Sequence, residues 1–373
     1  MLKILDKYIL KKFLGTFVFS ISLILAIFIV FDISEKLQDF IAGKVPIKEI
    51  IFDHYLNFLP YYGNLFSPLF TFISVIFFTS KMASKTEFVA ILSSGTSFTR
   101  ILRPYMIGAS IITISSLILS HFIIPIANKT RFEFEDKYIN TNYNTDEINI
   151  HKQIAPGTVL YLSNYDNTSN SSNLITIEKV VNNKQVYMLK ADGMVWDSIK
   201  HLWNLKNVFE RNLIYTVTDS IKNKQKFIFH ETHKLLPTKE LKIDFTPKDM
   251  IRFQSKIEVL PYFELKQFIL KEKQKGSNRI EYFEVEMYQR TAFPFATFIL
   301  TIIAVSLSSR KIRGGVGLQI ALGLVLSCVY ILFMHISKTF ATSGQSIQPL
   351  LAVWIPNFVF SIIAFYLYKK AQQ

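Results

Sequence analysis

Apolar residues form six long stretches that contain almost no charge, and the polar residues collect between them. A helix needs about 20 apolar residues to cross the hydrocarbon core of a bilayer, and each stretch comes close to that length. The pattern therefore predicts an α-helical membrane protein with six transmembrane helices. We place these helices at about 13–31, 55–80, 104–126, 291–309, 316–336 and 347–368.

A polar segment at about 127–281 separates the first three helices from the last three. It contains short runs rich in β-branched and aromatic residues, and Asn-rich turns separate them. Many short strands of this kind favour a β-sandwich or a jelly roll. We place the strands at 158–162, 174–181, 185–189, 213–217 and 227–229.

Three parts follow from this pattern, and the fold class is a six-helix membrane protein arranged 3+3 around an inserted extracytoplasmic β-jelly-roll domain. The first part, 1–126, holds helices 1–3 and a short helix at about 84–95. The second, 127–281, is the jelly-roll-like domain, and the third, 282–373, holds helices 4–6.

The net charge of +14 follows the membrane topology. The N-terminus, the 81–103 and 310–315 loops and the C-terminus together hold thirteen Lys or Arg residues against only Asp6 and Glu87. The two short loops on the other side, 32–54 and 337–346, are more acidic than basic. The positive-inside rule therefore places both termini in the cytoplasm, and the charge gives no reason to expect nucleic acid as a partner.

Catalytic and ion-coupling chemistry is not visible in the six helices. The middle of each predicted span lacks Asp, Glu, Lys and Arg, which ion-coupled transporters keep there for function. The chain has no metalloprotease, serine-hydrolase or P-loop motif, and its one cysteine, Cys328, lies in an apolar run. We expect no catalytic residue, metal or cofactor, and a transport function would need a partner that supplies energy.

The loop between the second and third helices contains a candidate docking helix. Ser84 has the spacing to cap it with Glu87 in a capping box, while Phe88, Ile91 and Leu92 share one face and Gly95 ends it. Such a helix fits two interpretations. It lies on the lipid headgroups, or it inserts into a groove of an ATPase subunit with Glu87 facing basic groups there.

Several motifs resemble one family. The similar motifs lie in both membrane halves and near the end of the polar segment. They are Leu5–Ile9, Phe31-Asp32, Thr86-Glu87 through Ser97 with Arg100 after it, Phe245–Asp249, the group Glu286, Arg290, Ala292 and Pro294, and Ala352–Asn357. The family is that of the LptF/LptG (YjgP/YjgQ) permeases of the lipopolysaccharide export ABC transporter. The moderate length and uninterrupted β-domain favour the LptG-like of its two paralogous members.

This resemblance implies a permease, not an enzyme, in the inner membrane of a Gram-negative bacterium, with a role in cell-envelope biogenesis. Its implied partners are lipopolysaccharide, a second permease (LptF-like), a cytoplasmic ABC ATPase dimer (LptB-like) and a bitopic bridge protein (LptC-like). The ATPase subunits would hydrolyse ATP. The β-domain would lie in the periplasm and pass lipopolysaccharide to the bridge towards the outer membrane.

The resemblance also implies site residues, with a substrate cavity lined by the first and fifth helices. Lys36 would attract the phosphates of lipid A from the cavity rim, although a solvated or snorkelling lysine explains it as well. The first helix itself carries no charge from Phe13 to Phe31, so it offers no buried basic group for a phosphate. The second permease would then supply phosphate recognition instead. The ATPase-coupling set is Glu87, Phe88, Ile91, Gly95, Ser97 and Arg100, and the cavity and gate set is Lys36, Phe28, Phe31, Ile320, Leu324 and Tyr330.

Two other classes of protein remain as alternatives. A mechanotransmission protein would couple ATP hydrolysis to an external domain without conducting substrate, but such proteins often have four spans. A membrane scaffold would need neither Glu87 nor an ATPase. Identifying the proteins that co-purify with the chain separates these classes.

Overall fold

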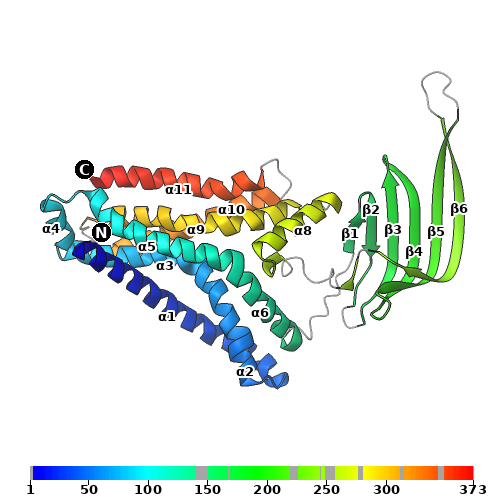
Figure 1. Ribbon diagram of the computed structural model, residues 1–373, viewed down its shortest axis with the longest axis horizontal. Coiled ribbons are helices and arrows are strands. Elements are labelled where there is room, and N and C mark those ends of the chain that lie inside the picture. The colour runs from blue at the N-terminus through cyan, green and yellow to red at the C-terminus, as the bar shows by residue number, and fades with distance from the viewer. Residues whose placement is uncertain are drawn as a thin grey trace. The chain divides into compact units, whose positions relative to one another are not determined.

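The protein forms two compact units, shown in the computed structural model of Figure 1. The helical unit comprises Met1–Ile139, Ile257–Lys266 and Glu281–Gln373, and the β-unit comprises Asn140–Lys256 and Gln267–Ile280. The structure describes residues 3–139, 150–166, 169–218, 226–243, 245–247, 257–275, 280–310, 315–342 and 348–372. The helical unit thus extends past the expected boundary at 126.

The helices follow the apolar stretches of the sequence. In chain order they are α1 (Ile4–Ala42), α2 (Ile47–Glu49), η1 (Ile50–Tyr55), α3 (Leu56–Ser84), α4 (Glu87–Ser93), α5 (Phe98–Ile118), η2 (Leu119–Ile123), α6 (Ile124–Tyr138), α8 (Tyr262–Lys275), α9 (Ile280–Ser308), α10 (Gly315–Thr342) and α11 (Pro349–Gln372). Within the described residues, six helical stretches are long and apolar enough to cross a membrane. The predicted six spans, three on each side of the inserted sheet, are confirmed.

Close packing within the helical unit depends on small residues. Gly108 of α5 lies against the ring of Phe13 in α1, and a Cβ atom added there would come within 2.5 Å of that ring. Gly323 lets α10 approach α3 in the same way, because an added Cβ would lie 2.2 Å from Ile76 Cδ1. Small residues at such crossings are typical of membrane helices, whose association depends on packing rather than on escape from water.

Two π-helical segments, η1 and η2, interrupt long helices at the end of the helical unit away from the chain termini. A π segment frees backbone carbonyl groups from the regular hydrogen-bond ladder. In η1 the side-chain amide of Asn57 compensates, donating to the carbonyl oxygens of Phe52 (2.9 Å) and Asp53 (3.0 Å). This local geometry positions His54 and Tyr55, the last two residues of η1.

The β-unit contains a six-stranded antiparallel sheet whose strands pair in chain order. The strands are β1 (Ile150–Ala155), β2 (Thr158–Leu162), β3 (Ser171–Val181), β4 (Lys184–Asp197), β5 (Leu202–Thr218) and β6 (Lys226–Leu241). The inserted β-domain is therefore confirmed. Its described strands pair in chain order as one antiparallel meander.

Alternating apolar residues give this sheet one buried face. Leu160 pairs with Ile177, which pairs in turn with Leu189, and all three side chains are buried. Trp203 on β5 is fully buried, stacks on Phe245 and donates its indole N–H to that residue's carbonyl oxygen at 2.7 Å. The β-unit thus has its own hydrophobic core, separate from that of the helices.

Candidate functional site

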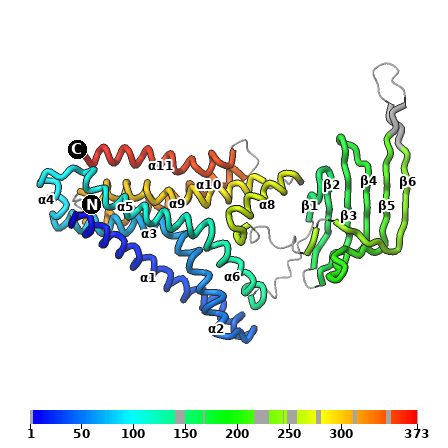
Figure 2. The backbone as a smooth tube through the Cα atoms, in the orientation of Figure 1, coloured from blue at the N-terminus to red at the C-terminus, as the bar shows by residue number. Residues whose placement is uncertain are grey.

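The short helix α4 connects α3 and α5 at the end of the helical unit where both chain termini lie, as Figure 2 shows. Its core-facing side is set by Phe88, which is fully buried and packs near Phe98, and by the half-buried Ile91. Val89 and Leu92 are exposed, so the expectation that Leu92 is buried together with Phe88 and Ile91 is wrong: at 36% exposure it lies at the edge of that face. α4 is therefore fixed to the helical bundle by one face and presents the other.

The ends of α4 agree with the sequence in one respect and differ in another. Gly95 has a φ of +82° just after the helix, the left-handed conformation that favours glycine, so it ends the helix as predicted. The predicted capping box at Ser84 is wrong. Ser84 ends α3 and its hydroxyl donates to the carbonyl oxygen of Lys81, while Thr86 occupies the N-cap position of α4.

Glu87 is the first residue of α4 and is half-exposed. Within the part of the chain that the structure describes, its carboxylate makes no hydrogen bond or ion pair. A carboxylate in the first helical turn is favoured there by the helix dipole. Glu87 therefore has a well-positioned backbone and a carboxylate that pairs with none of the described residues.

Ser97 and Arg100 lie in the turn that follows α4. Ser97 caps α5, because its hydroxyl accepts the backbone N–H of Arg100 at 3.3 Å. The Arg100 guanidinium donates two hydrogen bonds to Asp6 of α1, at 2.6 Å to Oδ1 and 2.7 Å to Oδ2. Arg100, which the sequence assigned to the ATPase-coupling set, thus holds the start of α1.

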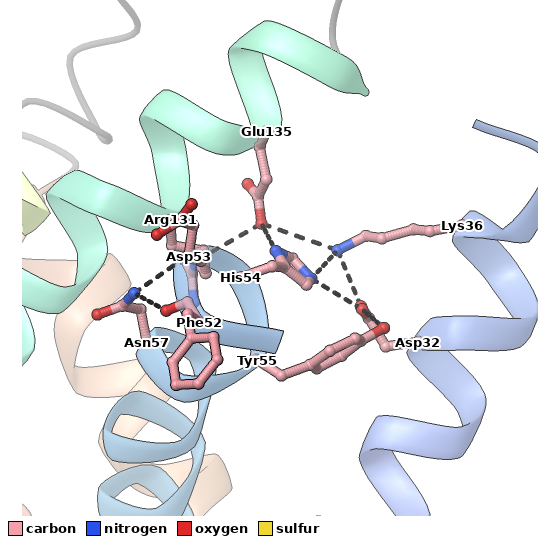
Figure 3. A network of polar contacts seen from close by, with 9 residues as sticks. All are labelled: Asp32, Lys36, Phe52, Asp53, His54, Tyr55, Asn57, Arg131 and Glu135. Atoms are coloured by element: carbon pink, nitrogen blue, oxygen red, sulfur yellow. Dashed lines mark hydrogen bonds and ion pairs between the residues drawn. The ribbon is translucent and has the colours of Figure 1, made fainter. Parts of the chain in front are cut away.

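A larger polar network lies at the other end of α1, where α1, η1 and α6 meet (Figure 3). Asp32 is at its centre, accepting from His54 Nε2 (3.0 Å) and from the Tyr55 hydroxyl (3.0 Å), and pairing with Lys36 Nζ (2.8 Å). Glu135 of α6 lies 3.7 Å from both Lys36 Nζ and His54 Nδ1. Five side chains from three helical elements thus share charge at one place.

The charged and polar groups of this network are largely buried. His54 is fully buried, and the Asp32 and Lys36 side chains are 14% and 20% exposed. Arg131 of α6 is buried beside Glu135, with its Nε and one terminal nitrogen lacking a hydrogen-bond partner. Buried donors of this kind favour an anion close by, and Glu135 Oε1, 3.5 Å from Arg131 Nε, is that anion.

Lys36 and the Phe residues of α1 occupy different environments. Lys36 extends from the helix into the network, so it is neither a loop residue nor fully solvated. Phe28 stacks on Phe66 of α3 with ring centroids 5.0 Å apart, while Phe31 is 69% exposed. The aromatic pair supports α1 on one side and leaves Phe31 on the uncovered side.

The fifth-span candidates also divide into two groups. Leu324 is exposed and Ile320 is half-buried at the edge of the core. Tyr330 is fully buried, and its hydroxyl donates to Asn357 Oδ1 of α11 at 2.8 Å. Asn357 in turn donates to the Ala292 carbonyl oxygen of α9 at 2.8 Å, so Tyr330 joins three helices and does not line a surface.

The buried Arg290 of α9 holds the segment that leads into α8. Its guanidinium donates to the carbonyl oxygens of Ile257 and Leu260, both at 2.7 Å. Near it, burial and the carboxylate of Glu286 raise the pKa of Glu258. The Glu286 and Arg290 pattern quoted from the sequence therefore has a structural role.

The fold and these sites define a multi-pass membrane protein with an inserted β-domain and a short helix between two spans. Among the described residues, no group of His, Cys, Asp and Glu side chains could hold a metal ion. The chain belongs to the family described as lipopolysaccharide export system permease LptF/LptG, which it matches over residues 7–370. The resemblance seen in its motifs is confirmed, and the family identifies a transport permease rather than an enzyme.

One relative extends this comparison. An uncharacterized protein of Aquifex aeolicus (strain VF5) is 24% identical over 310 residues, which cover 82% of this chain and 81% of that protein. The similarity therefore spans most of both chains and is not confined to one apolar helix.

The network at the α2 end of α1 is the feature that sequence reasoning missed. Asp32 and Lys36 have the i, i+4 spacing of a helical ion pair, and that signal was available. His54 and Glu135 carry no local signal, because they are distant in the sequence and meet only through the packing of η1 and α6.

Proposed function

We propose that this chain is a permease subunit of an ABC transporter that extracts lipopolysaccharide from the inner membrane and passes it to a periplasmic bridge. The observation that carries the proposal is α4. Phe88 anchors this helix in the bundle, while Glu87 keeps a carboxylate with no partner among the described residues. Family membership supplies the class of substrate.

The proposed orientation places the terminal end of the helical unit in the cytoplasm. That end carries α4 and both chain termini, and its loops hold most of the Lys and Arg residues outside the β-unit. The β-unit, inserted between α6 and α9, then lies in the periplasm. The inner membrane of a Gram-negative cell is where a lipopolysaccharide permease would operate.

In this orientation α4 docks on a cytoplasmic ATPase. Phe88 and Ile91 fix the helix, Gly95 ends it and Ser97 starts the next span, so the position of Glu87 is well defined. A carboxylate held in this way suits a basic groove on a partner, where a charge-assisted hydrogen bond would form. Two ATPase subunits would serve two permeases.

The substrate cavity is proposed between the first and fifth spans of this chain and those of a second permease. Each span contains an apolar stretch of 18 residues, and the share of that stretch that is buried inside the chain differs among the spans. It is 6% in α1 and 22% in α10, the two lowest values among the six spans. Phe31 and Leu324 lie exposed on these helices and suit acyl chains, with Phe28 and Ile320 at their packed edges. Lys36 lies at the rim, where its charge suits a lipid A phosphate.

Co-purification tests this proposal most simply. The tagged chain would be expressed in a Gram-negative host and isolated in mild detergent, alongside Glu87→Ala and Glu35→Ala. Glu35 is a matched control, because it is an exposed acidic residue at the other end of the helical unit. We expect the unsubstituted chain and Glu35→Ala to recover an ABC ATPase, a second permease and a bridge protein, and Glu87→Ala to lose the ATPase.

The outcomes separate the classes of protein. Recovery of no ATPase by the folded, unsubstituted chain would contradict the transporter and favour a membrane scaffold. An ATPase without bound lipopolysaccharide or a second permease would favour a mechanotransmission protein. Equal ATPase recovery by Glu87→Ala and Glu35→Ala would remove Glu87 from the docking contact.

A further inference from the structure

The ion pair between Asp6 and Arg100 joins α1, which lines the proposed substrate cavity, to the start of α5, which follows the proposed docking helix α4. Asp6 is 2% exposed, and both of its carboxylate oxygens accept from the Arg100 guanidinium. Oδ2 also accepts the backbone N–H of Lys3 at 2.8 Å, which fixes the carboxylate at the first turn of α1. Two parallel hydrogen bonds restrain orientation as well as distance.

Arg100 is connected to α4 by a short turn and by aromatic packing. Ser97 starts α5 and accepts the Arg100 backbone N–H, so Arg100 sits in the first turn of that helix. Phe98, two residues before Arg100, is buried and packs near Phe88 of α4, with ring centroids 6.4 Å apart. A displacement of α4 would therefore reach the Arg100 side chain through packed aromatic rings and one helical turn.

On the other side of the pair, Asp6 begins the least covered span of the chain. Ile9 and Phe13 of α1 are fully buried. In the apolar 18-residue stretch of this span, however, only 6% of the residues are buried inside the chain. Phe13 fits against Gly108 of α5, the same helix that carries Arg100. The terminal end of α1 is thus held against α5 by the Asp6–Arg100 ion pair and by Phe13, which packs on Gly108 and Tyr105, while Tyr8 contacts Phe78 of α3.

We propose that Asp6 and Arg100 are a positioning pair that transmits movement of α4 to α1. This proposal rests on the proposed function, in which α4 docks on the ATPase and α1 lines the substrate cavity. Arg100 then acts within the chain and does not contact the ATPase. Breaking the pair uncouples ATP hydrolysis from lipopolysaccharide extraction while the ATPase remains bound.

The variants are Arg100→Gln, Asp6→Asn and the charge-reversed pair Asp6→Arg with Arg100→Asp. Arg103→Gln is the control, because Arg103 is an exposed basic residue in the same turn region. Each would be purified as the full complex and reconstituted in proteoliposomes containing lipopolysaccharide. ATPase recovery, ATP hydrolysis and lipopolysaccharide released per ATP would be measured for each.

We expect Arg100→Gln and Asp6→Asn to recover the ATPase as the unsubstituted chain does, and to release about tenfold less lipopolysaccharide per ATP, within the usual range of coupling between sites. The charge-reversed pair restores most of the ratio, and Arg103→Gln leaves it unchanged. Loss of ATPase recovery in Arg100→Gln would make Arg100 a docking residue and overturn the proposal. An unchanged release ratio would overturn it as well.

The distance between spin labels on α4 and α1 adds a second measurement, and a change in stability alone would not alter it. Cys328 is the only cysteine, so Cys328→Ser gives a background for spin labels at Ser93 on α4 and Ser34 on α1, both exposed. With ATP and vanadate, the label distance changes in the unsubstituted pair and stays fixed in Arg100→Gln. If the single variants fold poorly, the charge-reversed pair decides, because an unrestored release ratio overturns the proposal.

Failure of this inference differs from failure of the proposed function. If the unsubstituted chain recovers no ATPase, the transporter itself is contradicted. If the ATPase is recovered and Glu87→Ala loses it, but Arg100→Gln couples normally, only the positioning pair is wrong.

Discussion

The first and fourth spans, α1 and α9, are both long and apolar, yet they are integrated into the molecule in opposite ways. In the most apolar window of α9, 61% of the residues are buried inside the chain, against 6% in α1. α9 packs along its length, whereas α1 is attached by polar groups near its two ends and by a few aromatic contacts such as Phe13 and Phe28, and leaves one side uncovered. A span that its own chain does not cover has a surface for lipid, substrate or another subunit.

Side-chain size explains part of this contrast. α9 places Ala292, Ala296 and Ala304 in the interior, all fully buried, where small residues allow neighbouring helices to approach. α1 directs large residues outward, with Phe19 and Phe31 each 69% exposed. Close packing and an open aromatic surface are alternative uses of equally apolar sequence.

The largest expected effect on stability comes from truncating the packed end of α1. Phe13→Ala removes a fully buried ring, and we expect it to cost about 3 kcal/mol, near the low end for buried Phe, because lipid rather than water solvates a separated helix. Phe19→Ala, on the uncovered side, should change stability little. Thermal unfolding in detergent compares them, and equal losses would contradict the contrast between the two parts of α1.

Overfilling the same contact should have a smaller effect. Gly108→Ala places a methyl group where an added Cβ lies 2.5 Å from Phe13, and overpacking of this kind costs about 1–3 kcal/mol. Gly15→Ala on α1 meets no atom within 4 Å, so we expect it to be neutral or slightly stabilising. A destabilised Gly15→Ala would indicate that α1 is covered where the structure shows it open.

The network at the α2 end predicts a comparable or smaller loss. Asp32→Ala leaves Lys36, His54 and Tyr55 without their shared acceptor, and an unsatisfied buried donor costs about 1–3 kcal/mol. Glu35→Ala removes an exposed acidic residue from the same helix and is the control. If both variants unfold at the same temperature, the network does not hold α1.

We expect the smallest effect on stability in the β-unit, because its ion pairs are partly solvated. Burial alone would raise the pKa of Glu210, but hydrogen bonds from Lys239 and Tyr187 outweigh it and hold this pKa below its usual value near 4.5. A lowered folded-state pKa contributes stability above pH 4.5 that is lost as pH falls through the folded value. Glu210→Gln removes this pH-dependent component.

Tryptophan fluorescence can isolate this measurement. Of the three tryptophans, Trp196 and Trp203 lie in the β-unit and Trp354 lies in α11. In a Trp354→Phe background, unfolding followed between pH 3 and pH 7 therefore reports on the β-unit of the full chain. A pH profile unchanged by Glu210→Gln would show that its ion pair contributes nothing.

The sequence predicted elements whose signals are local. Six apolar stretches predicted the spans, and 158–162 matches β2, because length and residue type suffice there. The strand at 150–155 was missed, and the strands at 185–189, 213–217 and 227–229 are longer than predicted. Polar residues on the exposed face of the sheet dilute the β signal, which hides strand ends.

The candidate site was predictable to the same extent. The short helix with Glu87, its apolar anchor and its Gly95 terminus follow from local spacing. The partners of Arg100 and of His54 do not, because Asp6 and Asp32 meet them only after α1 has packed against α5 and η1. Long-range ion pairs depend on tertiary structure that no local pattern carries.

Photo-crosslinking from the uncovered spans tests the central claim, that α1 and α10 line the substrate cavity. A photoreactive residue would replace Phe31 on α1 or Leu324 on α10, and Phe365 on α11 is the control, because its side chain is also exposed. In cells, we predict crosslinks to lipopolysaccharide from the first two positions and few from the third. Equal lipopolysaccharide crosslinking from all three, or from Phe365 alone, would contradict the account.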